Sequence, residues 1–268
     1  MANALDVLLG PVANLGRSFL GTVLGLGSFF VFTCRGLIHM FSLPLQWAKA
    51  VQQVYFIGVK SVAVIALIGL FTGMVLGLQG YYTLVKFGAE GLLGAAVALS
   101  VIRELGPVLT AIMITGRAGS SMAAELGIMR ISEQIDALDA MDVDPVRYLV
   151  GPRLVASLIC FPLLTAMFDV IALLGGYLTG VMMLGVSPGI YWARIHDSVV
   201  LRDVNGGFSK SLVFALLVAA VCCYEGFYAH RRPGVYGAKG VGLSTTSAVV
   251  TSCVCILASD YALTSFLL

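Results

Sequence analysis

Residues 62–85 read VAVIALIGLFTGMVLGLQGYYTLV and contain no charged side chain. A helix needs about 20 mostly apolar residues to cross the hydrocarbon core of a bilayer. This run is long enough to do so, and it is longer than the apolar runs that form strands in soluble proteins. The stretch therefore predicts a transmembrane helix, and it decides the class to which the chain belongs.

Four further stretches share these properties. They are residues 91–116, 154–184, 207–229 and 240–266, each mostly apolar with few charges. Together with residues 62–85 they predict about five transmembrane helices. We therefore expect an all-α integral membrane protein.

The composition supports this expectation. Of the 268 residues, 59% are hydrophobic and 11% are charged, whereas a soluble domain has about 45–50% apolar and about 25% charged residues. A formal net charge of +2 gives no basic patch for nucleic acid. The six cysteines lie in apolar stretches without a CxxC pair, as expected of small buried hydrophobic side chains. These features exclude an ordinary soluble enzyme, a disordered tail and a nucleic-acid-binding protein.

The first 45 residues have a different pattern. Apolar side chains on one predicted helical face oppose polar ones on another, a pattern typical of helices that lie in the membrane interface. Residues 18–33 are apolar, but as a helix they would be only about 24 Å long. We therefore predict an interfacial or partly inserted arm over residues 1–45, broken or kinked at Pro11, and a transmembrane domain over residues 46–268. The two faces are Leu5, Leu8, Leu9, Val12, Gly16 and Phe19 against Asn3, Asp6, Asn14 and Arg17.

Basic residues between the predicted helices indicate the topology. Residues 117–153 and 230–239 together carry seven Lys and Arg residues, whereas residues 86–90 and 185–206 together carry three. Cytoplasmic loops carry an excess of Lys and Arg. We therefore expect the first two loops on the cytoplasmic side and the C-terminus on the opposite side.

Arg103 and Glu104 lie near the middle of an apolar stretch and are followed by Pro107. A charge at the bilayer centre costs about 2.5–3.5 kcal/mol on insertion scales. Adjacent residues point in different directions on a helix, so we expect each charge to have its own partner. The two interpretations are buried ion pairs between helices and a polar patch in a substrate cavity, where a guanidinium suits a lipid phosphate.

Glycines recur at intervals of four residues. They are Gly69, Gly73 and Gly77 in one predicted helix and Gly176 and Gly180 in another. Small residues at this spacing let helix backbones approach closely in lipid. The pattern favours tight helix packing, and the alternatives are the lining of a wide cavity or a dimer seam.

The stretch between residues 125 and 144 holds six of the chain's 14 acidic residues. Within it, Ile131, Ile135, Leu138 and Met141 have helical spacing. We predict a short amphipathic helix here, with Ser132 as its N-cap and Asp144-Pro145 ending it. An acidic helix on the cytoplasmic side is either a docking element or a solvated surface helix.

No catalytic constellation is recognisable. The chain lacks the GxxxxGK[ST], HExxH and GxSxG motifs, and its three histidines are scattered. We expect neither enzymatic activity nor a cofactor, so energy for transport would come from another chain or from an ion gradient. Three further acidic residues lie in or near the predicted helices and suit either ion sites or inter-helix pairs: Asp169, Glu225 and Asp260.

Several stretches resemble one known family. They read GMVLGLQGY at 73–81, RELGPVLTA at 103–111, GRAGSSMAAE at 116–125, MRISEQIDAL at 129–138 and MDVDP at 141–145. They resemble the MlaE (YrbE) permeases of ABC transporters that work with mammalian-cell-entry (MCE) proteins. The resemblance covers roughly residues 45–268 and is most specific over residues 100–153.

The resemblance implies a multi-pass homodimer in the inner membrane of a Gram-negative bacterium. Such a permease is non-catalytic and moves glycerophospholipids between the outer and inner membranes, which maintains outer-membrane lipid asymmetry. Its implied partners are two copies of a cytoplasmic ATPase (MlaF-like), a STAS-domain protein (MlaB-like) and a periplasmic hexamer of an MCE-domain protein (MlaD-like).

The resemblance also implies roles for particular residues. A lipid cavity at the dimer interface would be lined by Leu76, Tyr81, Leu84, Arg103 and Glu104. The segment 132–141 would be the coupling helix in the groove of the ATPase, through Ser132, Glu133, Gln134, Asp136, Leu138, Asp139 and Met141.

Two other functions are alternatives to that of an ABC transporter permease. The first is an ion-coupled secondary transporter with Asp169, Glu225 and Asp260 as ion sites, which leaves the acidic helix unexplained. The second is an intramembrane enzyme acting on lipids, for which the chain offers no nucleophile–base pair.

Overall fold

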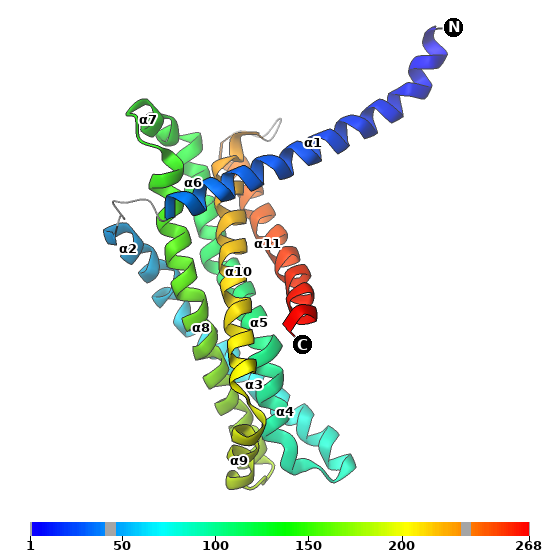
Figure 1. The fold of residues 1–268 in the computed structure, drawn as a ribbon, viewed down its shortest axis with the longest axis vertical. Coiled ribbons are helices and arrows are strands. Elements are labelled where there is room, and N and C mark those ends of the chain that lie inside the picture. Colours follow the sequence, from blue (N-terminus) through cyan, green and yellow to red (C-terminus); the bar gives the residue numbers. More distant parts are fainter. Residues whose placement is uncertain (1, 41–46, 232–236, 268) are drawn as a thin grey trace.

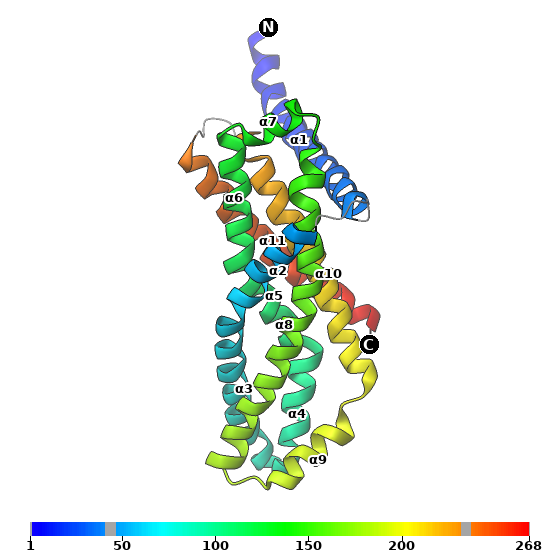
Figure 2. The same ribbon diagram turned by 90° about the vertical axis from the view of Figure 1, so that its left-hand side faces the viewer.

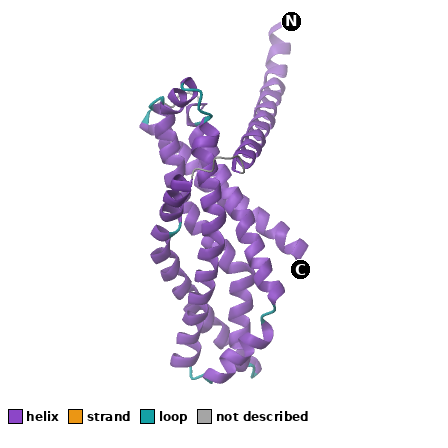
Figure 3. Ribbon diagram, turned by 60° about the vertical axis from the view of Figure 1, so that its left-hand side comes forward, coloured by secondary structure: helices purple, strands orange, loops and turns teal. Residues whose placement is uncertain are grey.

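The computed structural model describes residues 2–40, 47–231 and 237–267. None of these residues lies in a β-strand, and short turns join the helices (Figure 3). The all-α prediction is confirmed. The helices assemble into an elongated bundle in which α3, α4, α8 and α10 run along the long axis (Figures 1 and 2).

By length and composition, six helices of the described chain could cross a membrane: Val23–Met40, Trp47–Phe87, Glu90–Ile131, Val146–Met183, Leu201–Phe227 and Ala238–Phe266. The last five correspond to the five predicted stretches, of which 154–184 and 207–229 run one and two residues beyond the observed helices. The remaining one lies in α1 (Ala2–Met40), within the segment predicted as a partly inserted arm. It meets the length requirement because the stretch up to Met40 stays apolar on average despite Arg35 and His39.

Helix α1 lies obliquely across the bundle, at the end that carries α7 (Figures 1 and 2). The helix is continuous from Ala2 to Met40, so it is not broken at Pro11; the predicted alternative, a kink at this proline, stays a prediction. The predicted apolar and polar faces of residues 3–19 lie outside the described side chains.

Aromatic contacts hold the second half of α1 against α10 (Leu201–Phe227). Phe29 and Phe32 lie edge-on to Tyr224, with ring centroids 5.3 and 5.7 Å away. The hydroxyls of Ser28 and Tyr224 are 2.6 Å apart, within hydrogen-bonding distance. These contacts position α1 even though most of its large apolar side chains remain exposed.

The second helix that could cross a membrane, Trp47–Phe87, consists of α2 (Trp47–Ile57), η1 (Val59–Ser61), α3 (Val62–Leu84) and η2 (Val85–Phe87). The third is formed by η3 (Glu90–Leu92), α4 (Leu93–Ser100), η4 (Val101–Leu105), α5 (Gly106–Ile114), η5 (Thr115–Gly119) and α6 (Ser120–Ile131). The short α7 (Gln134–Ala140) connects it to η6 (Val146–Val150), α8 (Gly151–Tyr177) and η7 (Leu178–Met183). Of these, η4, η5, η6 and η7 are π-helical turns. The chain ends with α9 (Pro188–Ser198), α10, η8 (Ala229–Arg231) and α11 (Ala238–Leu267).

The regularly spaced glycines of α3 pack against α8. Gly73 lies directly on the backbone of Ala172, where an added Cβ would overlap the carbonyl group. Gly77 meets Gly176 in the same way one turn further on. Tight helix packing within one chain is therefore confirmed for these glycines, and they are not available to form a dimer seam.

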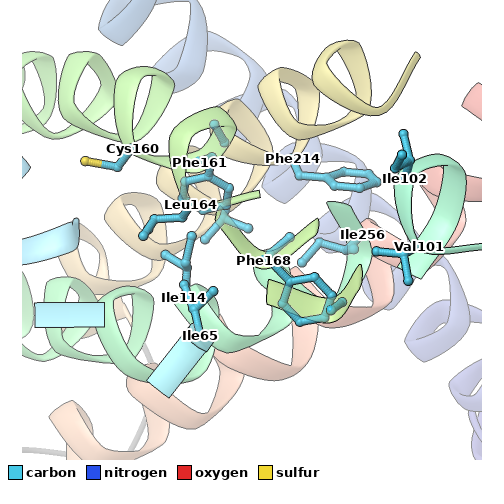
Figure 4. Packing of buried hydrophobic residues seen from close by; sticks show 14 of the residues in the cluster. Ile65, Val101, Ile102, Ile114, Cys160, Phe161, Leu164, Phe168, Phe214 and Ile256 are labelled. Atoms are coloured by element: carbon cyan, nitrogen blue, oxygen red, sulfur yellow. The ribbon is translucent and has the colours of Figure 1, made fainter. Parts of the chain in front are cut away.

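Large apolar side chains fill the centre of the bundle (Figure 4). Phe161 and Phe168 of α8 and Phe214 of α10 are almost fully buried, together with Ile114 of α5. Close packing of such side chains leaves little freedom for the helices to slide. This core fixes the relative positions of η4, α5, α8 and α10, and three of these elements, η4, α8 and α10, carry charged groups of the interior.

Helix α9 packs on the end of the bundle opposite α7 (Figure 1). Its Tyr191 is fully buried and donates a hydrogen bond from its hydroxyl to the carbonyl of Leu173, at 3.0 Å. Burial raises the pKa of Tyr191 to about 12, so this hydroxyl stays neutral. The ring also lies edge-on to Trp192 and Tyr177.

Candidate functional site

Arg103 and Glu104 lie in the π-helical turn η4, immediately before α5. Pro107 in the first turn of α5 has no N–H, so the carbonyl of Arg103 lacks the donor that it would have in an α-helix. Lys210 of α10 donates from Nζ to this carbonyl, at 3.0 Å. The proline therefore creates a free acceptor inside the bundle, and a charged side chain from a distant helix occupies it.

Lys210 is the centre of a charged cluster. The side chain is buried, and its Nζ lies 2.6 Å from Glu104 Oε2 and 3.0 Å from Asp260 Oδ1. Thr264 Oγ1 accepts a hydrogen bond from the same nitrogen at 2.7 Å and donates one to Glu104 at 3.2 Å. Buried charges are tolerated only when ion pairs and hydrogen bonds satisfy them together, and this arrangement provides both.

Arg103 has a separate partner. Its Nε and one terminal nitrogen lie 2.9 and 2.8 Å from Asp203 Oδ1. The other carboxylate oxygen of Asp203 accepts a hydrogen bond from the backbone N–H of Val200 at the start of α10. The prediction that Arg103 and Glu104 have different partners is confirmed, and the pairs join η4 to α10 and α11.

A small pocket of about 130 Å³ lies at this cluster. It is lined by Arg103, Glu104, Arg202, Asp203, Gly206, Gly207, Lys210 and Thr264. With Asp260, its three cationic and three carboxylate side chains cancel in formal charge. Sequence reasoning identified Arg103 and Glu104 here, and the inter-helix pairing that it considered for Asp260 is observed with Lys210. The signal for Lys210 itself was a lysine in the apolar stretch 207–229.

The apolar residues assigned to the same cavity lie elsewhere in this chain. Leu76, Tyr81 and Leu84 of α3 are half-buried against the hydrophobic core. None of them lines the pocket at Arg103. A single chain therefore does not bring the apolar and charged members of the predicted lipid site together in this pocket.

Helix α7 lies at one tip of the bundle (Figure 1). Of the predicted apolar face, Ile135 is 1% exposed and Leu138 is half-buried, so these two face the bundle. Ile131 and Met141 are exposed instead, so the predicted face is only partly formed. The other residues predicted to contact an ATPase are exposed: Ser132, Glu133, Gln134, Asp136, Asp139 and Met141. The segment therefore presents an acidic surface with an apolar methionine, which is 65% exposed.

The predicted caps of α7 are wrong. Ser132 donates its hydroxyl proton back to the carbonyl of Ile128 in α6, at 2.8 Å, and α7 begins after Glu133 instead. The carboxylate of Asp144 accepts the N–H of Val146 at 2.9 Å, so it starts the next helical segment and does not end α7. In both cases the side chain serves the neighbouring helix, because local hydrogen bonds compete for the same Ser or Asp.

Ion pairs fix α7 and the adjacent chain. Arg130 of α6 lies 2.7 Å from Asp136 and donates from Nε to Nδ1 of His230 in η8, at 3.0 Å. Asp144 lies 3.1 Å from His39 at the end of α1. The tip is therefore tied to α1, α6 and η8 at once.

Comparison with known proteins gives consistent matches. The chain matches the family described as "Permease MlaE" over residues 50–266. It is 42% identical over 179 residues to a probable ABC transporter permease protein of Rickettsia typhi, which covers 67% of each chain. A protein of the same description from Rickettsia bellii is 38% identical over 221 residues, 82% of this chain and 83% of that one. The intermembrane phospholipid transport system permease protein MlaE of Haemophilus influenzae is 38% identical over 180 residues, 67% of each chain.

Proposed function

The chain belongs to the MlaE family of permeases, membrane subunits of ABC transporters, and from this premise we propose that it moves glycerophospholipids between the outer and inner membranes of a Gram-negative bacterium. Residues 46–268 form the permease domain in the inner membrane, and residues 1–45 form an arm at its interface. The permease is non-catalytic, and a separate ATPase hydrolyses ATP. This transport maintains the lipid asymmetry of the outer membrane.

The observation that carries this proposal is the charged cluster around Lys210 in an otherwise apolar bundle. Charged side chains at membrane depth normally face a cavity or a bundle interior and mark a substrate pathway. The cluster offers the partly exposed guanidinium of Arg103 to a phosphate and the partly exposed carboxylate of Glu104 to an amine. A phospholipid headgroup has this mixed chemistry.

The lipid cavity requires a second copy of the chain. The pocket of about 130 Å³ at Arg103 is smaller than the roughly 300–1,000 Å³ that a drug-sized ligand needs, and a phospholipid is larger still. In a homodimer, the cavity extends between the two chains, with Leu76, Tyr81 and Leu84 along its apolar part and Arg103 and Glu104 at its polar part.

Segment 132–141 is the coupling element for the ATPase. Its exposed acidic residues and Met141 form the contact, while buried Ile135 and the Arg130–Asp136 pair pass movement on to α6. Two copies of an MlaF-like ATPase bind the dimer on this cytoplasmic side, together with an MlaB-like STAS-domain protein. An MlaD-like MCE-domain hexamer binds on the periplasmic side, where α9 lies.

The test is purification of the chain in detergent after co-expression with its genomic neighbours, followed by mass spectrometry of proteins and lipids. We expect an ATPase, an MCE-domain protein and glycerophospholipid to co-purify. A chain that purifies alone, without lipid, and supports gradient-driven uptake would overturn the proposal in favour of a secondary transporter.

A further inference from the structure

Asp169 in the middle of α8 differs from the other carboxylates near it. Glu104, Asp203 and Asp260 each have a Lys or Arg nitrogen within 3.0 Å. Asp169 forms neither an ion pair nor a hydrogen bond with any described residue, and its Oδ1 is buried. This carboxyl group is therefore the exception in an interior where charges are otherwise matched.

The opposing helix leaves space for this side chain. Gly106 of α5 lies against Asp169 Oδ1, and a Cβ at Gly106 would overlap that oxygen. Because α7 joins α6 to η6 at one end of the bundle, α5 and α8 run in opposite directions. One helical turn toward α7, Thr110 on α5 therefore comes level with Thr165 on α8.

These two threonines are also unusual. Both are buried, and neither hydroxyl has a hydrogen-bond partner among the described residues. Buried hydroxyls nearby behave differently: Thr115 and Ser157 each donate to the carbonyl four residues earlier, at 2.7 and 2.9 Å. Three unsatisfied oxygens thus lie in two adjacent layers between α5 and α8, where each carries a desolvation cost.

Among the residues that the structure describes, none offers Asp169 a positively charged partner. Of the elements packed against this part of α8, α4 and α5 carry no ionisable side chain, and those of α2 and α3 lie toward the ends of these helices. The charged groups of η4 and the facing part of α10 already contact one another: Arg103 with Asp203, and Glu104 with Lys210. An isolated ionised carboxylate in such surroundings is so costly that the group takes up a proton instead.

We propose that Asp169 holds a proton at neutral pH and forms, together with Thr110 and Thr165, a buried proton-binding site beside the charged cluster. As a neutral acid, Asp169 needs no counter-ion, and the two hydroxyls extend the polar strip by one turn toward α7. Release of the proton requires water or a cation to reach the carboxyl group, so it accompanies movement of α5 against α8. The site is separate from the proposed lipid contacts and does not depend on them.

The test is infrared spectroscopy of the purified full-length chain in detergent, in H₂O and in D₂O at neutral pH. We expect the carbonyl stretch of one protonated carboxylic acid per chain, with a shift on deuteration. Asp169→Asn removes this band. Asp203→Asn is the matched control, because it removes a carboxylate that is paired with Arg103, and the band persists.

Two results would overturn the proposal: absence of the acid band in the unmodified chain, or its persistence in Asp169→Asn. Thermal unfolding gives an independent readout. Since Asn replaces a neutral acid of nearly the same shape, we expect Asp169→Asn to change Tm by less than about 2 °C, whereas Asp203→Asn lowers Tm more because it leaves Arg103 unpaired. If Asp169→Asn does not fold, Asp169→Glu replaces it; the band must then change frequency, and an unchanged band contradicts the assignment.

Discussion

The cluster around Lys210 and the tip at α7 both concentrate charge, but they arrange it in opposite ways. In the cluster, the carboxylates of Glu104, Asp203 and Asp260 have cationic partners within 3.0 Å, and these pairs join three separate helices. At the tip, Asp136 pairs with Arg130, while the acidic surface as a whole remains open to solvent. The difference teaches that interior charges here hold helices together, whereas at the tip several acidic side chains, Glu133 and Asp139 among them, remain exposed for contact with a partner. Four predictions test this contrast.

The largest effect is expected from Lys210→Met. The substitution keeps an unbranched side chain as far as Cε but leaves Glu104 and Asp260 without their shared cation. Breaking a buried pair in this way costs about 3–5 kcal/mol, which thermal unfolding in detergent measures. Lys60→Met, which removes an exposed lysine, is the control and should leave Tm nearly unchanged. Equal stability of the two variants would contradict the structural role of the cluster.

Charge reversal at the tip should have the opposite effects, with little loss of stability and a large loss of partner binding. Asp136→Lys together with Asp139→Lys changes exposed side chains and removes the solvent-exposed Arg130–Asp136 pair, so the loss of stability should be about 0–1 kcal/mol, as is typical of a surface ion pair. Association with the proposed ATPase should weaken by about 10- to 100-fold, since like charges across an interface are unfavourable. Quantitative pull-down measures this loss. Asp197→Lys, an exposed acid in α9 at the other end, is the control, and equal complex yields for both would refute the docking role.

Arg103→Gln distinguishes two roles within the cluster, the joining of helices and the binding of lipid. The Arg103 side chain is 42% exposed, so its loss should destabilise the fold much less than the loss of Lys210. We expect a several-fold decrease in co-purified phospholipid, because one charge-assisted contact to a phosphate is lost. Lipid mass spectrometry measures it, with Arg194→Gln in α9 as control. Unchanged lipid occupancy would assign Arg103 to structure alone.

The smallest effect is expected for α1, because its aromatic contact with α10 contains no ion pair. Tyr224→Phe removes the hydroxyl that lies 2.6 Å from Ser28 but keeps the ring packed against Phe29 and Phe32. The expected loss is about 0.5–1.5 kcal/mol, detectable as faster hydrogen exchange in residues 23–40. Tyr261→Phe, which changes an exposed side chain of α11, should leave that exchange unchanged. A loss as large as that for Lys210→Met would mean that the aromatic contacts contribute little.

Local sequence patterns predict much of the fold, but they predict the candidate site only in part. Apolar runs predicted the five main helices because length and hydropathy are local properties. The glycine spacing predicted tight helix packing, but the structure was needed to show that α3 packs on α8. Separate partners for Arg103 and Glu104 followed from helical geometry. That Asp203 and Lys210 are those partners did not, since about 100 residues separate them from η4 and no local pattern encodes such a contact.

Errors arose where two helices compete for one side chain. Ser132 is as suitable for the end of α6 as for the start of α7, and the backbone decides between them. Glu133 takes a left-handed conformation, with φ at 58°, which separates the two helices one residue later than predicted. Asp144 likewise follows one helix and precedes another, and its contact with Val146 depends on a turn that composition does not reveal.

The π-helical turn that carries Arg103 and Glu104 has a consequence for how the chain tolerates insertions and deletions. A π-helical turn contains one residue more than an α-helical turn, so it is equivalent to a single-residue insertion in a regular helix. Deleting one residue from Val101–Leu105 would restore the regular helix and leave α4 and α5 in nearly the same orientation, because the turn itself accommodates the extra residue. The side chains within the turn would point in new directions, so Arg103 and Glu104 would lose their register with Asp203 and Lys210 although every amino acid needed for the pairs was still present. The number of residues in this turn is therefore as important to the site as the identity of its side chains.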